Sequence, residues 1–191
     1  MPGKFYTTVI LLAALIFGYP EWVAEAAAPE LEVKLTFDLP LSLSCSGRVQ
    51  LFSLPEGKLA QKAYLPPEAW RLLEGRELSP ETTWEVTLVQ GEIVFRAAGG
   101  EEVFHSGEPL LLRAAEGGEL KLNGRSYPGT FQFWPGGELS IFNRLGLEDY
   151  VAGVLSCEAY ASWPLEALKA NAVAIRTYTL YSLGKHDIYD L

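Results

Sequence analysis

Four residues near the C-terminal end of the sequence carry groups that could bind or transform a ligand: Glu158, Tyr160, Trp163 and Arg176. Glu158 is a candidate general acid and base, because a carboxyl group can donate and then accept a proton. Arg176 lies in a stretch with few other charges, where a buried guanidinium needs a carboxylate, a group of carbonyls or a ligand. The structural alternatives are a solvated or helix-capping Glu158, and an ion pair of Arg176 with one of three acidic residues, Glu148, Asp149 or Glu166.

Two helices are expected to position these residues. Residues 147–155 (LEDYVAGVL) begin with two acidic residues, which favour the positive end of a helix dipole. The longest helix is expected from Pro164, which fits a first helical position, to Leu183, with Gly184 as the stop signal. Because this second segment is apolar on most sides, the sequence predicts a buried helix, with Glu158 in the loop between the two helices.

The residues before these helices have the pattern of antiparallel strands. Residues 31–38 (LEVKLTFD) alternate strictly between apolar and polar side chains, which is the period of a half-buried strand. Asn123-Gly124 favours a two-residue hairpin turn, and residues 67–74 are interpreted as one or two helical turns. The fold class is therefore predicted to be α+β, with an antiparallel β-rich N-terminal part followed by an α-helical segment. Further strands are expected at residues 83–89, 92–97, 109–113, 119–123, 125–134 and 138–143.

The composition excludes several classes of protein. The 191 residues are 49% apolar and 20% charged, which is too apolar for a disordered chain. The net charge of −9 and the absence of a basic cluster argue against a nucleic-acid-binding protein. Cys45 and Cys157 are too few for a disulfide-rich scaffold, and with His105 and His186 they lack the spacing of a zinc site. A Cys45–Cys157 disulfide and two free thiols remain alternatives.

The first residues have the order of a secretory signal: a positive charge, the apolar run VILLAALIF from Val9 to Phe17, and the small residues of Ala24-Glu25-Ala26. We expect residues 1–26 to be cleaved after Ala26, with Ala28 as a second candidate. An uncleaved membrane anchor is the alternative, although the apolar run is shorter than the roughly 20 residues needed to span a bilayer. In either case the remaining chain is expected to be extracellular or in the cell envelope.

The C-terminal residues resemble the SpoIID/LytB family, which includes the stage II sporulation protein D and the amidase-enhancer protein. The resemblance rests on LEDYVAGV from Leu147, on Glu158, on SWPLEALKA from Ser162 and on AVAIRTY from Ala172. Together with the signal pattern and the strand pattern, it divides the chain into three expected regions: a signal peptide at residues 1–26, a β-rich region at 27–125, and an incomplete SpoIID/LytB-type domain at 126–191.

The resemblance implies a secreted lytic transglycosylase, which cleaves peptidoglycan glycan strands between N-acetylmuramic acid (MurNAc) and N-acetylglucosamine (GlcNAc) and forms 1,6-anhydroMurNAc. The family's catalytic acid falls on Glu158, and an arginine tied to activity falls on Arg176, which is assigned to substrate binding. Tyr160 and Trp163 are candidates for stacking on sugar rings. One carboxyl group suffices for this reaction, and because it must start protonated, Glu158 is expected to be desolvated between the helices.

The family also contains a non-catalytic type of protein, so the alternative function is an amidase enhancer that regulates a wall amidase. A secreted β-rich domain that only binds the wall or a partner is the third hypothesis. The implied partners are peptidoglycan glycan strands and a wall amidase, and no nucleic acid. Two prolines of the family's loop are replaced by Ser156 and Tyr160, which predicts a looser frame around Glu158.

Family sequences usually continue beyond Tyr189-Asp190-Leu191 with a segment that bears Cys and His residues and supplies zinc ligands in some members. We therefore expect a chain truncated at its C-terminus, with catalytic activity a property of the full-length protein. No cofactor is expected within the chain, and zinc is expected only through the absent segment.

Overall fold

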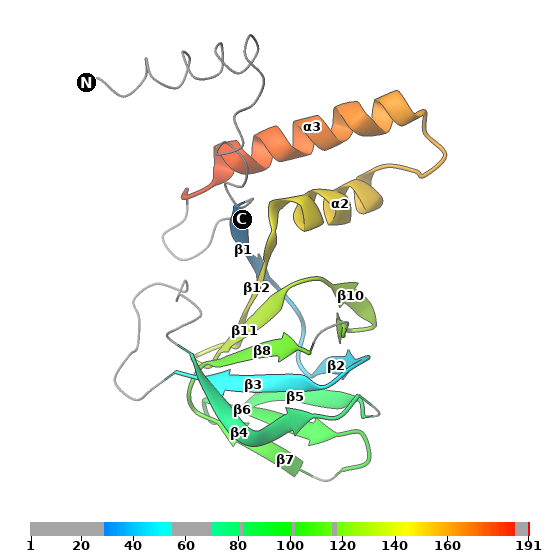
Figure 1. The fold of residues 1–191 in the computed structure, drawn as a ribbon. Coiled ribbons are helices and arrows are strands. Elements are labelled where there is room, and N and C mark those ends of the chain that lie inside the picture. Colours follow the sequence, from blue (N-terminus) through cyan, green and yellow to red (C-terminus); the bar gives the residue numbers. More distant parts are fainter. Residues whose placement is uncertain (1–28, 55–69, 81, 101, 116–117, 186–190) are drawn as a thin grey trace, which may run out of the picture.

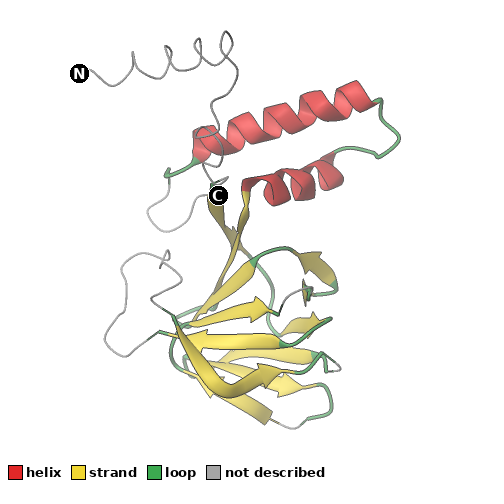
Figure 2. Ribbon diagram, in the orientation of Figure 1, coloured by secondary structure: helices red, strands yellow, loops and turns green. Residues whose placement is uncertain are grey.

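The computed structural model describes residues 29–54, 70–80, 82–100, 102–115, 118–185 and 191. Two antiparallel sheets pack against each other, and two helices lie together at one end of them (Figures 1 and 2). The predicted α+β fold class is confirmed. The signal peptide predicted at residues 1–26 lies outside the described residues.

Each sheet contains six strands. The first sheet has the order β1 (Glu30–Leu35), β12 (Ser140–Gly146), β11 (Thr130–Trp134), β8 (Leu110–Ala114), β3 (Val49–Ser53) and β4 (Arg71–Leu78). The second sheet has the order β10 (Arg125–Tyr127), β9 (Leu120–Leu122), β2 (Leu41–Cys45), β5 (Trp84–Val89), β6 (Glu92–Ala97) and β7 (Glu102–Ser106).

The hydrophobic core lies between the two sheets and is made by side chains that alternate along each strand. Leu41 and Leu43 of β2, for example, are fully buried, whereas Ser42 between them is exposed. Phe95 of the second sheet and Phe133 of the first place their ring centroids 6.2 Å apart. The alternation that predicted strands therefore also determines which side chains form the core.

The predicted strands are all present, and residues 125–134 divide into β10 and β11. Asn123 and Gly124 have φ values of 49° and 78° and connect β9 to β10, which confirms the predicted hairpin turn. The helical turns predicted at residues 67–74 are wrong in their described part, because residues 71–74 belong to β4. The predicted boundary between residues 125 and 126 falls within β10, whereas strands give way to helices between Gly146 and Leu147.

Helices α2 (Leu147–Glu158) and α3 (Leu165–Ser182) form a hairpin that follows β12 directly (Figure 1). A small cluster of buried residues connects α2 to the first sheet through Leu31, Leu145, Leu147 and Val151. Gly184 follows α3 with φ at 69°, as predicted for the residue that ends this helix. Neither of the two described helices combines the length and apolar character needed to cross a membrane.

The prediction that α3 is a buried helix is wrong. Only Thr179 and Ser182 of this helix are buried, and Tyr178 and Tyr181 are 69% and 74% exposed. The reason is that α3 packs on α2 along one side, through Ala172 and Ile175, while its other sides face solvent in the described structure. The apolar character of a helix predicts how much surface it could bury, and its neighbours decide how much it does.

Candidate functional site

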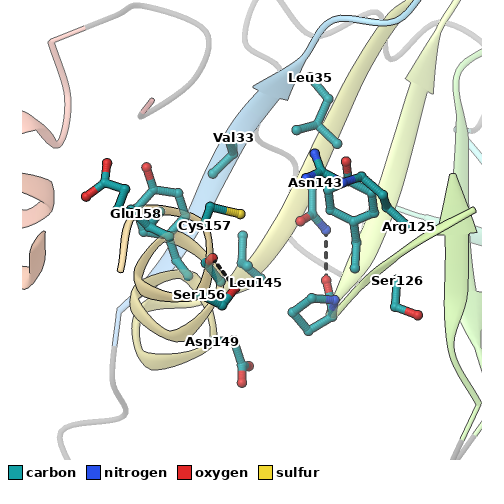
Figure 3. Close-up of a pocket in the computed structure, with 15 residues that line it drawn as sticks. Val33, Leu35, Arg125, Ser126, Asn143, Leu145, Asp149, Ser156, Cys157 and Glu158 are labelled. Carbon is teal, nitrogen blue, oxygen red and sulfur yellow. Dashed lines mark hydrogen bonds between the residues drawn. The ribbon is translucent and has the colours of Figure 1, made fainter. Parts of the chain in front are cut away.

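A cavity of about 500 Å³ lies between α2 and the two sheets (Figure 3), and we call it the α2 groove. Its floor is formed by two neighbouring strands of the first sheet, through Val33 and Leu35 of β1 and Asn143 and Leu145 of β12. One wall is formed by residues 125–128, which comprise β10 and the residue after it. The other wall is formed by α2, through Asp149, Tyr150, Gly153, Val154, Ser156, Cys157 and Glu158.

The period of α2 explains why one helix supplies a whole wall. Tyr150, Val154 and Cys157 are spaced by four and three residues, so they lie on one helix face. Gly153 on the same wall has no side chain, and nothing lies within 4 Å of the position that a Cβ would occupy. The groove therefore retains free space beside the helix.

The floor and the opposite wall are held together by Asn143. Its side-chain amide is buried and donates hydrogen bonds to the backbone carbonyls of Pro128, at 2.9 Å, and Thr130, at 3.2 Å. Between these two residues, Gly129 has φ at 88°, and a Cβ there would overlap the carbonyl group of Arg144. The turn between β10 and β11 is thus positioned by a buried side chain and a close backbone approach.

Glu158 is the last residue of α2 and is among the residues that line the groove, with its carboxyl group directed away from the floor strands and Arg125 (Figure 3). It is exposed, so the desolvation expected from two apolar helices is not present in this structure. Burial raises the pKa of the neighbouring Tyr150 phenol, and the charges of Glu158 and Tyr178 raise it further. Tyr150 therefore keeps its proton at neutral pH and can act as a hydrogen-bond donor within the groove.

Tyr160 and Trp163 lie in the loop between the helices. The Trp163 backbone N–H donates to the Tyr160 backbone carbonyl at 3.0 Å, and the ring centroids of the two residues are 6.4 Å apart. Both side chains are exposed, at 75% and 43%, and neither lines the groove. They are close in sequence to Glu158 but do not share its cavity, so their role in sugar stacking stays a prediction.

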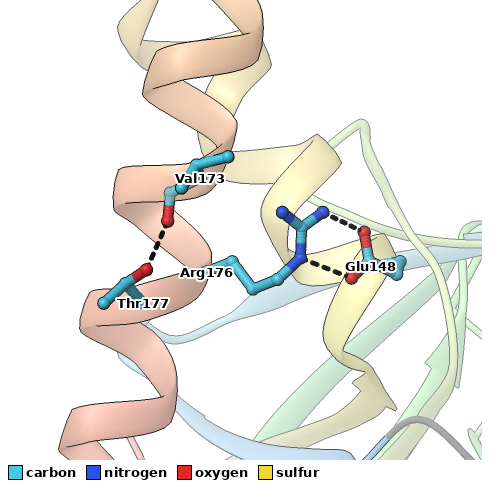
Figure 4. A network of polar contacts seen from close by, with 4 residues as sticks. All are labelled: Glu148, Val173, Arg176 and Thr177. Atoms are coloured by element: carbon cyan, nitrogen blue, oxygen red, sulfur yellow. Dashed lines mark hydrogen bonds and ion pairs between the residues drawn. The ribbon is translucent and has the colours of Figure 1, made fainter. Parts of the chain in front are cut away.

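Arg176 of α3 forms an ion pair with Glu148 of α2, which is one of the alternatives that the sequence leaves open (Figure 4). Arg176 Nε donates to Glu148 Oε1 at 2.7 Å, and Nη2 donates to Oε2 at 2.5 Å. The hydrogen bonds from Arg176 hold the pKa of Glu148 below its ordinary value, and those same bonds raise the pKa of Arg176. Arg176 does not line the α2 groove, and its role in substrate binding stays a prediction.

Two charged residues of the groove were not identified from the sequence. Arg125 comes from β10, and Asp149, which the sequence indicates only as a helix-start residue and a partner for Arg176, lines the groove on the first turn of α2. The Asn123-Gly124 turn placed Arg125 at the start of a strand, but nothing local indicated which helix it would face. The described residues contain no group of three His, Cys, Asp or Glu side chains that could hold a metal ion.

Both cysteines are free thiols. Cys45 is buried in the core between the sheets, and this burial raises the pKa of its thiol. Cys157 is exposed and lies in the helix wall of the groove, next to Glu158 (Figure 3). Of the two alternatives that the sequence left open, the structure has the free thiols.

The helices and their preceding strand define the class of protein. Residues 135–191 match the SpoIID family model, described as stage II sporulation protein. This part of the chain, from the turn before β12 through α2 and α3, therefore carries a SpoIID domain, which confirms the resemblance there.

A second comparison extends this result without adding a function. An uncharacterized protein of Brachyspira hyodysenteriae is 48% identical over 80 residues, which are 41% of this chain and 21% of that relative. The chain thus spans about a fifth of the length of the curated relative it matches. No solved structure matches the chain.

Proposed function

We propose that this chain belongs to an exported cell-wall lytic transglycosylase, which cleaves glycan strands between MurNAc and GlcNAc and forms 1,6-anhydroMurNAc. One observation carries the proposal. Glu158, the residue that falls on the family's catalytic acid, is among the residues that line a cavity of about 500 Å³, which is within the size range of small-molecule sites. A sugar chain in this groove would have a carboxyl group at its edge.

The reaction needs one carboxyl group in two successive roles. Glu158 protonates the glycosidic oxygen as the bond from C1 of MurNAc to that oxygen breaks. The resulting carboxylate accepts the proton of the C6 hydroxyl as O6 bonds to C1, so the enzyme regains its starting state and no water is consumed.

The positions of the other acidic residues support a mechanism with one carboxyl group. Asp149 also lines the groove, but Glu158 is nine positions further along the helix, which corresponds to roughly 13.5 Å along its axis. Glycosidases that use two carboxyl groups place them roughly 5–9.5 Å apart. Glu148 is held by Arg176. Neither residue is therefore placed to act as a nucleophile or a second base beside Glu158.

The bound glycan itself can supply the desolvation that the free protein lacks. A sugar ring at the rim of the groove would displace water from Glu158, and a carboxyl group favours its neutral form when water is removed. Tyr150, on the same wall, offers a phenol donor to the sugar or to the carboxylate.

The test is digestion of peptide-free glycan strands by the full-length protein, with the products identified by mass spectrometry. The protein is expected to release anhydroMurNAc ends, which are lighter than reducing ends by one water, and Glu158→Gln is expected to release none. Glu166→Gln is the matched control, because Glu166 is exposed on α3 and pairs only with Lys169 among the described residues. Equal cleavage by Glu158→Gln contradicts the assignment of the acid, and reducing ends indicate a hydrolase.

A regulator of a wall amidase is the second candidate function. The observation that favours it is the exposed apolar surface of α3, formed by Val173, Tyr178, Leu180 and Tyr181, which could contact a partner protein. In that case neither the protein nor Glu158→Gln releases products from glycan. Both stimulate an amidase equally, and substitution of Tyr178 and Tyr181 by serine reduces the stimulation.

A further inference from the structure

Arg125 is the cation that lines the α2 groove, on the wall opposite Asp149 and Glu158. It lies on β10, the edge strand of the second sheet, and its side chain is exposed. Among the described residues, no acidic side chain forms an ion pair with it. Arg144 on β12 and Arg176 on α3 are instead held by Glu30 and Glu148.

The aromatic side chain beside Arg125 gives this wall a fixed apolar surface. Tyr127 is two residues further along the strand and so lies on the same face of β10. Its ring packs edge-on against Phe37, with centroids 6.4 Å apart, and against Phe131, with centroids 6.0 Å apart. Tyr127 and Tyr150 thus place an aromatic ring on each wall, and such rings with a few polar groups are typical of small-molecule sites.

We propose that the α2 groove binds a GlcNAc–MurNAc unit and that Arg125 binds the lactyl carboxylate of MurNAc. The choice of MurNAc as the ligand depends on the proposed function, whereas the choice of an acidic sugar depends on the groove. A guanidinium binds a carboxylate through two parallel N–H···O bonds, and Arg125 has no competing acid among the described residues. Arg176, the residue to which the sequence assigned this role, would first have to release Glu148.

The charge of the chain makes a local cation necessary. The net charge is −9, so an anionic sugar is not attracted by the protein as a whole. The Asp149 carboxylate on the opposite wall would repel a carboxylate that bound in the reverse orientation. Arg125 therefore determines both which sugar is bound and which end of it faces the sheets.

Cys157 provides a test that does not depend on catalysis. Its thiol is free and exposed in the groove wall, whereas Cys45 is buried and serves as an internal reference. We would measure the rate at which a thiol reagent modifies Cys157 in the full chain, with increasing concentrations of the GlcNAc–MurNAc disaccharide or of chitobiose, which lacks the lactyl group.

The disaccharide is expected to slow the modification of Cys157 several-fold, and chitobiose to slow it much less at the same concentration. Arg125→Gln should require at least ten-fold more disaccharide for the same protection. The concentration that Arg125→Lys requires should lie between those of the unchanged protein and Arg125→Gln. Arg48→Gln is the matched control, because Arg48 is an exposed arginine outside the groove.

Three results would overturn the inference, even where the protein cleaves glycan. They are equal protection of Cys157 by the two sugars, protection that Arg125→Gln does not weaken, and no protection by either sugar. Protection that depends on Arg125, together with glycan cleavage unaffected by Glu158→Gln, supports the inference and contradicts the proposed function. The two failures are therefore distinguishable.

Discussion

Arg176 on α3 is bound by both carboxylate oxygens of Glu148, which lies on the first turn of α2 and 28 residues earlier in the chain. The pair bridges the two helices toward the end of the hairpin that lies away from their connecting loop. Since α3 has few other buried contacts, this interaction and the packing of Ala172 and Ile175 set how α3 lies against α2. Arg176 is thus paired outside the groove, whereas Arg125 lines it.

We expect Glu148→Gln to loosen α3 without unfolding the sheets. Because the pair is solvent-exposed, the Tm should fall by only a few degrees, whereas amide hydrogen exchange in α3 should become clearly faster. Glu166→Gln removes the exposed pair with Lys169 within α3 and should leave exchange at the α2–α3 contact unchanged. Equal exchange in both variants would show that the Arg176–Glu148 pair does not hold the helices together.

The contact between the helices should also depend on pH. Arg176 lowers the pKa of Glu148 in the folded protein, so the pair stabilises the fold fully above the pKa of a free glutamate, about 4.3. This stability is lost as the pH falls through the lowered pKa. Hydrogen exchange in α3, corrected for its intrinsic pH dependence, should therefore increase below about pH 4. The acid response should be absent in Glu148→Gln.

Asn143→Leu is expected to destabilise the protein by about 1–3 kcal/mol. The substitution keeps a similar volume but leaves the carbonyls of Pro128 and Thr130 without their donor, and an unsatisfied buried polar group costs about this much. Ser156→Ala removes an exposed hydrogen bond to the Gly153 carbonyl in the same groove and should change stability by less than about 0.5 kcal/mol. Denaturant unfolding of the two variants measures the difference.

Gly129→Ala is expected to be more damaging than Gly124→Ala. Both glycines have positive φ, so either substitution should cost about 1 kcal/mol from backbone strain alone. At Gly124 nothing lies near the new Cβ, whereas at Gly129 it would overlap the Arg144 carbonyl. The Gly129 variant should lose about 3 kcal/mol or more. A smaller loss than in Gly124→Ala would mean that the β10–β11 turn adapts freely.

The two thiols should react at rates that differ at least ten-fold. Cys157 is exposed, whereas Cys45 is buried and the pKa of its thiol is raised, so less of it is thiolate. A thiol reagent at pH 8 should therefore modify one cysteine per native chain quickly, and Cys157→Ser should abolish this fast phase. Two thiols that react equally fast would contradict the burial of Cys45. If neither thiol reacted, the result would indicate a disulfide.

Local patterns predicted most of the fold. Strict alternation identified β1, and the Asn123-Gly124 turn identified the β9–β10 hairpin, because both features depend on neighbouring residues alone. β2 shows the same alternation, with Leu41, Leu43 and Cys45 separated by serines, but it is not among the predicted strands. β4 was mistaken for a helix because it is an edge strand whose pairing with β3 is not visible in its own sequence.

The candidate site was less predictable. Glu158 was identified by its place in a family pattern, whereas the groove beside it depends on how α2 lies against β1, β10 and β12. Arg125 precedes Glu158 by more than thirty residues, and only the packed structure brings their two elements to one cavity. The burial of α3 could not be predicted either, because it depends on what packs against the helix rather than on its composition.

The pairing of β1 with β12 has a consequence for the synthesis of this protein. Val33 lies opposite Asn143, about 110 residues later in the chain, and together they form the floor of the α2 groove. A chain that leaves the ribosome or the export channel from its N-terminus therefore has β1 long before a partner for it exists. Folding that waits for such a distant contact is slow, and the unpaired strand edge is open to chaperones and to aggregation in the meantime. The groove is therefore completed late, because the protein acquires its site only after β12 and α2 have been made.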